Sequence, residues 1–92
     1  MAKHLRIIGL VQGVGYRASF ERQARALQLS GWVRNRADGS VEAMVNGSPD
    51  ALEKIIAWSR RGPAVAKVRE VRVSDADDVA VPDGDFEVRS TV

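Results

Sequence analysis

The stretch Gly9-Leu10-Val11-Gln12-Gly13-Val14-Gly15-Tyr16-Arg17 has the residue types and spacing of a phosphate-binding loop. Glycines let consecutive backbone N–H groups point into one concavity, because no Cβ blocks the conformation or the approach of a ligand. A helix that begins behind such a loop adds the positive end of its dipole. An arginine adds a planar set of donors that matches phosphate oxygens. We therefore predict a site for a small phosphate dianion, formed by backbone N–H groups of this glycine-spaced loop, by the start of the helix and by the guanidinium of Arg17.

This loop has an ordinary alternative interpretation. Gly-x-Gly after a strand is common in plain tight turns, and it is weak evidence for a ligand by itself. The stretch is also no nucleotide fingerprint, because a Walker loop needs Gly-Lys-Ser/Thr and here Tyr16-Arg17 follows the last glycine. A second group of residues has to meet the loop before a reaction can be inferred.

The elements that would position the loop follow from the hydrophobic pattern. Residues 4–11 alternate with period two and are rich in β-branched side chains, which predicts a strand. Its apolar residues recur on both sides toward the end, so it should lie centrally in a sheet. From Tyr16 the period changes, and Phe20, Ala24 and Leu27 mark the buried stripe of an amphipathic helix. Arg17 would lie in its first turn.

A hairpin and a second helix follow. Residues 32–35 and 41–45 read as two strands joined by residues 36–39, where Asp38-Gly39 supplies the positive φ that such turns need. Ser48-Pro49-Asp50 predicts a helix start, with Ser48 as the N-cap. The helix would bury Leu52, Ile55, Ile56 and Ser59, would have Trp58 at its flank, and would end at Gly62-Pro63.

The remaining chain predicts one long and one short strand. The valines of residues 65–74 change phase between Val68 and Val71, which indicates a β-bulge near residues 69–70. An exposed acidic loop is expected over residues 75–84, and a short final strand over residues 86–89. The order β-α-β-β-α-β is that of the ferredoxin-like α+β fold, with two helices on one face of a mainly antiparallel sheet and a short extra C-terminal strand.

This topology brings Asn35 to the loop. A right-handed crossover makes the first two strands parallel, so their C-terminal ends share one edge of the sheet, with the third strand antiparallel between them. Arg17 and Asn35 should therefore face the same small volume, although 18 positions separate them in the chain. The competing interpretation makes Asn35 a turn residue ahead of Asp38-Gly39.

Composition excludes several kinds of chemistry. The chain has 92 residues, which predicts a single domain over residues 1–92, and its net charge of +2 is too balanced for nucleic acid to be the main partner. It has no cysteine and one histidine, His4, expected on a face of the first strand, so thiol nucleophiles and His pairs are excluded. No apolar run suits a signal peptide or a membrane span, and a cytoplasmic monomer that binds no membrane is the expectation.

Two long motifs resemble those of the acylphosphatase family. Gly9 to Arg17 matches Gly-x-Val-Gln-Gly-Val-x-aromatic-Arg, and Gly31 to Val41 matches Gly-aromatic-x-x-Asn-x-x-x-Gly-x-Val. Residues 60–63 and 86–89 also look like this family, so the resemblance covers nearly the whole chain, and its length is that of the small stand-alone bacterial form. Residues 90–92 extend beyond the usual end.

The resemblance implies hydrolysis of acyl phosphates to a carboxylate and inorganic phosphate. Carried over by position, it makes Arg17 the phosphate-binding arginine, the amides of residues 13–17 the cradle, and Asn35 the residue that positions the attacking water. No cofactor and no metal are implied. Inorganic phosphate is expected to be both product and competitive inhibitor.

The residues are consistent with this reaction. A carboxylate leaving group has a conjugate acid with a pKa of about 4 to 5, so it can depart without being protonated. Neither motif offers a general acid. The first contains no Asp or Glu, and the only carboxylate of the second, that of Asp38, lies in the turn. Phosphoryl transfer of this kind depends mainly on positioning and on charge stabilisation.

Two non-catalytic alternatives remain open at this point. A ferredoxin-like sheet can bind RNA through aromatic residues at its centre, but residues 5–11 and 41–46 contain none. A degenerate regulatory domain could bind an anion without turnover. The presence of both Arg17 and Asn35 argues against that function.

Overall fold

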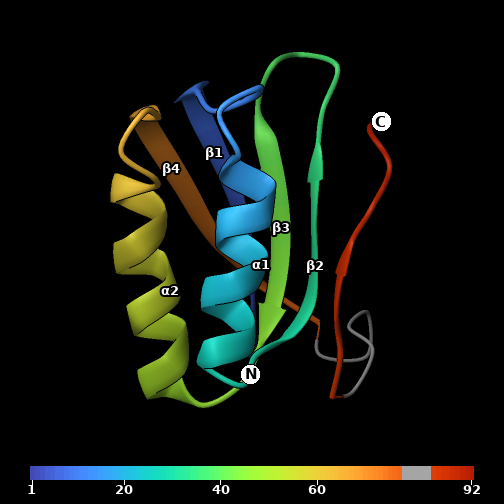
Figure 1. The fold of residues 1–92 in the computed structure, drawn as a ribbon. Coiled ribbons are helices and arrows are strands. Elements are labelled where there is room, and N and C mark those ends of the chain that lie inside the picture. Colours follow the sequence, from blue (N-terminus) through green and yellow to red (C-terminus); the bar gives the residue numbers. More distant parts are fainter. Residues whose placement is uncertain (78–83) are drawn as a thin grey trace.

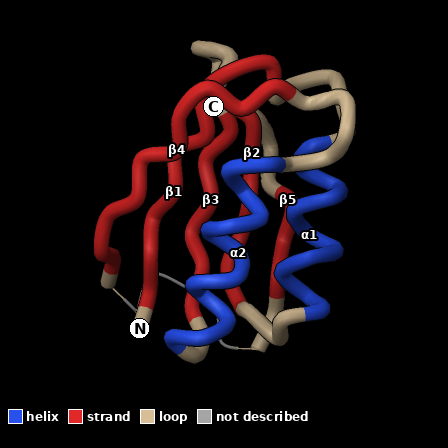
Figure 2. The backbone as a smooth tube through the Cα atoms, turned by 90° about the vertical axis from the view of Figure 1, so that its left-hand side faces the viewer, coloured by secondary structure: helices blue, strands red, loops and turns tan. Residues whose placement is uncertain are grey.

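The computed structural model describes residues 1–77 and 84–92, and in them two helices cover one face of a five-stranded sheet (Figure 1). Seen from the side, the helices and the sheet form two layers (Figure 2). The ferredoxin-like α+β fold is confirmed. The elements in chain order are β1 (Ala2–Leu10), α1 (Tyr16–Ala26), β2 (Ser30–Asn35), β3 (Val41–Asn46), α2 (Pro49–Arg61), β4 (Lys67–Ala76) and β5 (Phe86–Val88).

The strand order is β4-β1-β3-β2-β5, with β3 antiparallel to both β1 and β2. β1 and β2 are therefore parallel to each other, as the crossover predicts, and β1 lies inside the sheet. The final strand β5 pairs parallel with β2. As a result, the loop after β1 and the β2–β3 hairpin lie at the same end of the molecule (Figure 1).

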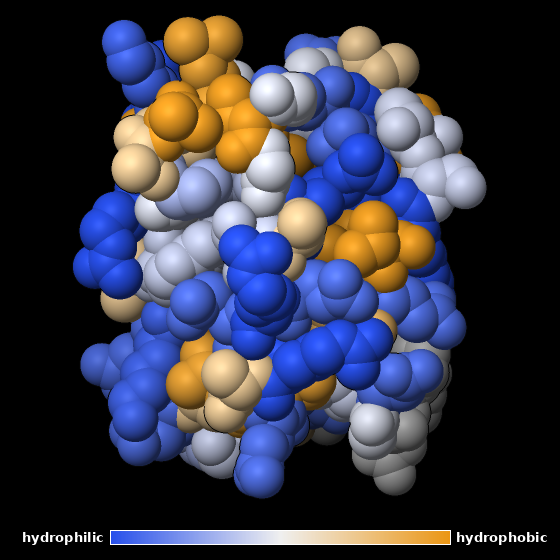
Figure 3. Space-filling view, viewed as in Figure 1, coloured by the Kyte–Doolittle hydropathy of each residue, from blue (hydrophilic) through white to orange (hydrophobic). Residues whose placement is uncertain are grey.

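The core fills the space between the helices and the sheet. The strands bury alternate residues against the helices, and α1 contributes Phe20 and Ala24 while α2 contributes Leu52 and Ile55. Ile56 and Leu27, expected in the buried stripes, are only partly buried against this cluster. The outward surface on the helix side is mainly hydrophilic, with small separate apolar areas (Figure 3). No helix in the described ranges is long and apolar enough to cross a membrane.

Local signals set the ends of α2. Ser48 Oγ accepts a hydrogen bond from the Ala51 amide at 3.2 Å, and Pro49 is the first helical residue, as predicted. Gly62 ends the helix with a φ of 66°, and its amide donates to the Trp58 carbonyl at 2.8 Å. The left-handed conformation favours glycine at this position.

A β-bulge lies where β4 meets the end of β1. Ile8 pairs with Glu70 and Gly9 pairs with Val68, so Arg69 is the extra residue, as the valine phase indicates. Gly9 has a φ of 141°, and a Cβ built there would lie 2.2 Å from the Lys67 carbonyl oxygen. The first motif therefore begins with glycine because β4 passes too closely for any side chain.

The C-terminal part differs from the prediction in two places. β4 begins two residues later than predicted and continues to Ala76, because its pairing with β1 extends to Ala2. The prediction of an acidic loop over residues 75–84 is therefore wrong for its first two residues, and residues 78–83 lie outside the described part of the chain.

After β5 the chain stays beside β2. The Arg89 amide donates to the Val33 carbonyl at 2.9 Å, and the Ala37 amide donates to the Val92 carbonyl at 2.7 Å. Residues 90–92 thus follow the strand that carries Asn35.

Candidate active site

Two glycines with positive φ shape the loop between β1 and α1. Gly13 and Gly15 have φ values of 75° and 76°, with Val14 between them. A Cβ at either glycine would meet nothing within 4 Å, so backbone conformation rather than space requires glycine at these two positions. Gly15 is the N-cap of α1, and no side chain caps this helix end. Its first amides are therefore available to a ligand.

Arg17 lies in the first turn of α1, as predicted, and is partly buried. Its guanidinium makes no hydrogen bond or ion pair with any residue in the described part of the chain. By contrast, Arg22 and Arg25 on the same helix donate to Ser19 and Glu21. Arg17 therefore keeps its full set of donors for an anion beside the helix N-terminus.

Asn35 ends β2, and its side-chain oxygen Oδ1 is buried without a donor among the described residues. Buried polar atoms are nearly always paired, so an orphaned acceptor needs a physical reason. The hairpin turn does not use it: the turn is closed by the Gly39 amide on the Arg36 carbonyl, at 3.0 Å, and by Asp38, which accepts from Ser40. The interpretation of Asn35 as a turn residue therefore has no contact to support it.

One cavity of about 260 Å³ brings the loop, Arg17 and Asn35 together. Of the residues predicted for the site, Gly13, Gly15, Tyr16, Arg17 and Asn35 line it, whereas Val14 packs partly buried against the core. The other lining residues are Val11, Ala18, Glu21 and Val88. The juxtaposition expected from the topology is present.

Gln12 joins the loop to the hairpin, a role that the sequence pattern did not predict. Its Nε2 donates to the Arg36 carbonyl at 2.7 Å and to the Ser40 carbonyl at 2.9 Å. Both donor hydrogens of the amide are used, one on each strand end of the hairpin. Gln12 therefore fixes the distance between the cradle and Asn35. Its place inside the first motif is the only signal that could have singled it out.

Glu42 supports the backbone around Asn35 from the neighbouring strand. Its Oε1 accepts from Arg34 at 2.8 Å and from Arg36 at 2.9 Å, the residues on either side of Asn35. Its Oε2 lies 2.6 Å from His4 Nε2, which explains the sheet-face position of that histidine. Burial alone would raise the pKa of Glu42, but the hydrogen bonds from His4, Arg34 and Arg36 lower it to about 2. The carboxylate stays ionised and holds both arginines.

Glu21 is a carboxylate that the sequence pattern did not place in the site. It lies one turn after Arg17 on α1 and lines the same cavity. The spacing i, i+4 from Arg17 was the available signal. Its Oε2 accepts from Arg25 at 3.2 Å, so an ion pair already engages its charge.

The phenol of Tyr16 is structural. Its hydroxyl donates to the Ser59 carbonyl at 2.8 Å, and its ring packs against Phe20 and Trp58. Burial raises the pKa of Tyr16. The side chain therefore anchors the start of α1 on α2. Among residues 1–77 and 84–92, no three His, Asp or Glu side chains are grouped so as to hold a metal ion.

Fold and site together define a small α+β protein in which a glycine-containing loop, an arginine at a helix N-terminus and an asparagine line one cavity. A family model described as acylphosphatase matches residues 3–88. An acylphosphatase of Azoarcus sp. (strain BH72) is 59% identical over 75 residues, which are 82% of this chain and 76% of that protein. One of Acidovorax sp. (strain JS42) is 48% identical over the whole chain and 93% of that protein.

The solved structures agree. An acylphosphatase from Coxiella burnetii superposes with a TM-score of 0.87 at 37% identity, covering 96% of this chain and 90% of that one. The chain therefore belongs to the acylphosphatase family. The hydrolase activity expected from the sequence is confirmed at the level of the family.

Proposed function

We propose that the chain hydrolyses acyl phosphates, with Arg17 and the loop amides holding the phosphoryl group and Asn35 orienting the attacking water. The observation that carries this proposal is the buried Oδ1 of Asn35, which has no donor among residues 1–77 and 84–92 and lies in the cavity that Arg17 also lines. A site with free donors on one side and a free acceptor on the other suits a phosphate and a water.

The donors bind the phosphoryl oxygens. In phosphoryl transfer, charge spreads over the three equatorial oxygens, and preorganised donors there stabilise the transition state. The guanidinium of Arg17 has no competing partner among the described residues, and the nest formed around Gly13 and Gly15 supplies backbone N–H groups. These groups act by position and charge and transfer no proton.

Asn35 acts on the nucleophile. Its Oδ1 accepts a hydrogen bond from the water and so directs a lone pair of the water oxygen at phosphorus. The new P–O bond forms as the bond between phosphorus and the acyl oxygen breaks, and the electron pair leaves on the carboxylate. An amide cannot take the proton of the water at neutral pH, so that proton passes to a phosphoryl oxygen of the substrate.

The leaving group sets the specificity. A carboxylate departs without protonation, whereas the alkoxide or phenoxide of a phosphate monoester benefits from an acid or a metal. Among the described residues, the one carboxylate that lines the cavity is that of Glu21, and Arg25 donates to it at 3.2 Å. We therefore propose a metal-independent reaction that favours acyl phosphates over monoesters.

The test compares benzoyl phosphate with p-nitrophenyl phosphate, with and without excess EDTA. We expect hydrolysis of benzoyl phosphate in both conditions and little or none of the monoester. The Arg17→Lys variant keeps the charge but lacks the planar fork, so turnover and phosphate affinity should both fall. Activity that EDTA abolishes and Mg²⁺ restores would refute metal independence, and near-native kinetics of Arg17→Lys would refute the role of Arg17.

The remaining expectations stay predictions. They are competitive inhibition by inorganic phosphate, a monomeric single-domain state, a cytoplasmic location, and the absence of nucleic-acid or membrane partners. No observation favours RNA binding: Trp32 on the open sheet face is only 6% exposed, and Arg34 and Arg89 stack on its ring at 4.5 and 5.0 Å. That ring is covered and cannot serve as a platform for bases.

A further inference from the structure

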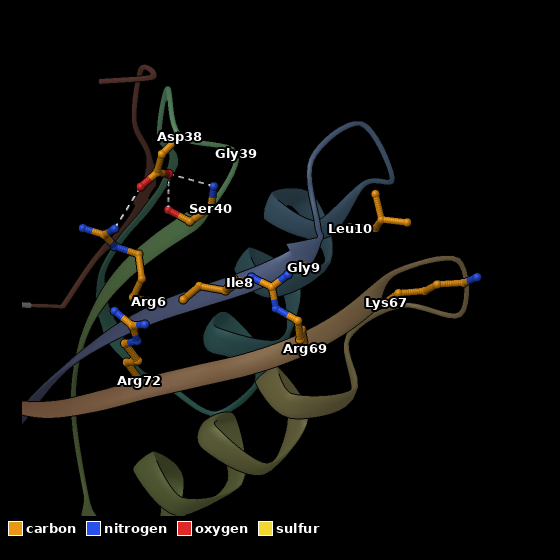
Figure 4. A pocket seen from close by; sticks show the side chains of 10 residues that line it. All are labelled: Arg6, Ile8, Gly9, Leu10, Asp38, Gly39, Ser40, Lys67, Arg69 and Arg72. Atoms are coloured by element: carbon orange, nitrogen blue, oxygen red, sulfur yellow. Dashed lines mark hydrogen bonds and ion pairs between the residues drawn. The ribbon is translucent and has the colours of Figure 1, made fainter.

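A larger groove lies on the open face of the sheet, away from the helices. It has a volume of about 620 Å³ and shares no lining residue with the cavity of the candidate active site. Ile8, Gly9 and Leu10 of β1 form its floor, the hairpin residues 38–40 form one wall, and β4 forms the other (Figure 4). The proposed hydrolysis leaves this groove without a role.

The charges of the groove are unbalanced. Four cationic side chains line it, those of Arg6, Lys67, Arg69 and Arg72, against one carboxylate, that of Asp38. Arg6 donates to Asp38 at 3.1 Å, and Arg72 donates at 2.8 Å to Glu70 outside the lining. The other two, Lys67 and Arg69, have no hydrogen bond or ion pair among the described residues, although the charge of Arg69 also acts on Glu70.

Those two are on the strand that forms the wall. Lys67 and Arg69 make no hydrogen bond or ion pair with the residues that the structure describes. Arg69 is the extra residue of the β-bulge, and its guanidinium lies over β1 beside Gly9 (Figure 4). The bulge leaves Arg69 without a partner residue on β1, and the Arg69 side chain lines the groove.

Arg6 supplies a further unused donor. Its Nε is buried and has no acceptor in the described part of the chain, although its terminal nitrogen binds Asp38. Arg6 also lies directly opposite Arg72 in the register of β1 and β4. Like charges in opposite positions are unfavourable, so this arrangement is stabilised when an anion lies between them.

We propose that this groove is a second anion site, which binds a compact polyanion with two or three negative charges on phosphate or carboxylate groups. The charge of the ligand follows from the surplus of cations, and its size from a volume more than twice that of the cradle cavity. The exposed Leu10 and the half-buried Ile8 allow the ligand to carry a small apolar part.

The test is a titration followed by NMR at constant ionic strength, with excess inorganic phosphate present to occupy the cradle. Pyrophosphate and citrate are the two probes, and they distinguish phosphate from carboxylate ligands. We expect the amides of Gly9 and Gly39 and the Nε–H signals of Arg6 and Arg69 to shift with saturation for at least one probe. Shifts confined to residues 13–17, or none that saturate, would overturn the proposal.

A matched pair of variants separates a built site from a general charge effect. Arg69→Glu should weaken binding of the probe about tenfold or more, because it removes a charged donor. Arg60→Glu changes the net charge equally at an exposed position on α2 and should leave binding within about twofold. Equal weakening in both would overturn the proposal.

The result does not depend on the hydrolytic activity. Arg69 lies outside the cradle, so Arg69→Glu should still hydrolyse benzoyl phosphate if the wild type does. Should this variant fail to fold, Arg69→Gln compared with Arg60→Gln gives the same contrast with half the charge change.

Discussion

Replacing Asn35 with alanine should abolish most turnover while leaving the stability of the protein nearly unchanged. Asn35 Oδ1 has no donor among the described residues, and in the proposed mechanism its partner is a water. Alanine removes that contact and keeps the Cβ, so the free energy of unfolding should change by no more than about 1 kcal/mol. For a domain of this size that limit corresponds to about 4 to 8 °C in Tm.

The rate of hydrolysis, by contrast, should fall. Loss of one contact that positions the nucleophile typically costs about 100-fold or more in kcat. The cradle lies on another loop, so the inhibition constant of inorganic phosphate should change little. A large fall in kcat with a constant inhibition constant is the signature of an interaction made with the water alone.

The assay measures Tm, kcat and phosphate inhibition on one preparation. Asn46→Ala is the matched control, because Asn46 also ends a strand and does not line the cavity. It should leave kcat within about twofold. If Asn35→Ala instead lowers stability by more than about 1 kcal/mol and keeps kcat within a few-fold of wild type, Asn35 is structural and the proposed mechanism loses its water-positioning residue.

Three further predictions concern the surroundings of the site. Gln12→Leu leaves the Arg36 and Ser40 carbonyls without their donor; we expect both a lower kcat and a loss of about 1 to 3 kcal/mol by urea unfolding, and unchanged kcat would show that Gln12 only stabilises the fold. Inorganic phosphate at about 100 times its dissociation constant should raise stability by about 2.7 kcal/mol; a melting curve identical to that in chloride at equal ionic strength would contradict a preformed cradle. Against the effect of burial, hydrogen bonds from His4, Arg34 and Arg36 lower the pKa of Glu42 from 4.5 to about 2 on folding, so the stability that this carboxylate contributes is complete above pH 4.5 and is lost as the pH falls toward 2. Urea unfolding between pH 2 and pH 6 should therefore show a smaller loss for Glu42→Gln than for wild type, and equal losses would contradict the network.

The fold could be predicted because each of its elements has a local cause. The alternation of Leu5 and Ile7 and the spacing of Phe20 and Ala24 depend only on which face is buried. Even the β-bulge could be inferred, because the change of phase between Val68 and Val71 requires one extra residue in the strand if both valines are to face the core side. Once the crossover is right-handed, the meeting of the loop with Asn35 follows from topology.

The contacts that hold the site could not be predicted, because they depend on the register and on the length of single side chains. Nothing in the sequence says that Gln12 reaches two carbonyls of the hairpin, or that Glu42 binds the arginines on both sides of Asn35. Glu21 lines the cavity because of the orientation in which α1 packs on the sheet, and the sequence alone does not give that orientation. The end of β4 could not be predicted because Asp75 and Ala76 are not typical strand residues, and their strand conformation comes from pairing with Lys3 and Ala2.

In a mutational scan that measures cellular abundance and specific activity independently, the glycines of the two motifs should fall into two groups with different effects. Gly9 and Gly31 each face a carbonyl oxygen, at 2.2 and 1.8 Å from a Cβ built on them, so substitutions there should deplete the protein itself. Gly13 and Gly15 face open space, so their variants should accumulate to a large extent and lose activity per molecule. One motif would thus yield two phenotypes, and a variant at Gly9 that is lost from cells carries no information about catalysis.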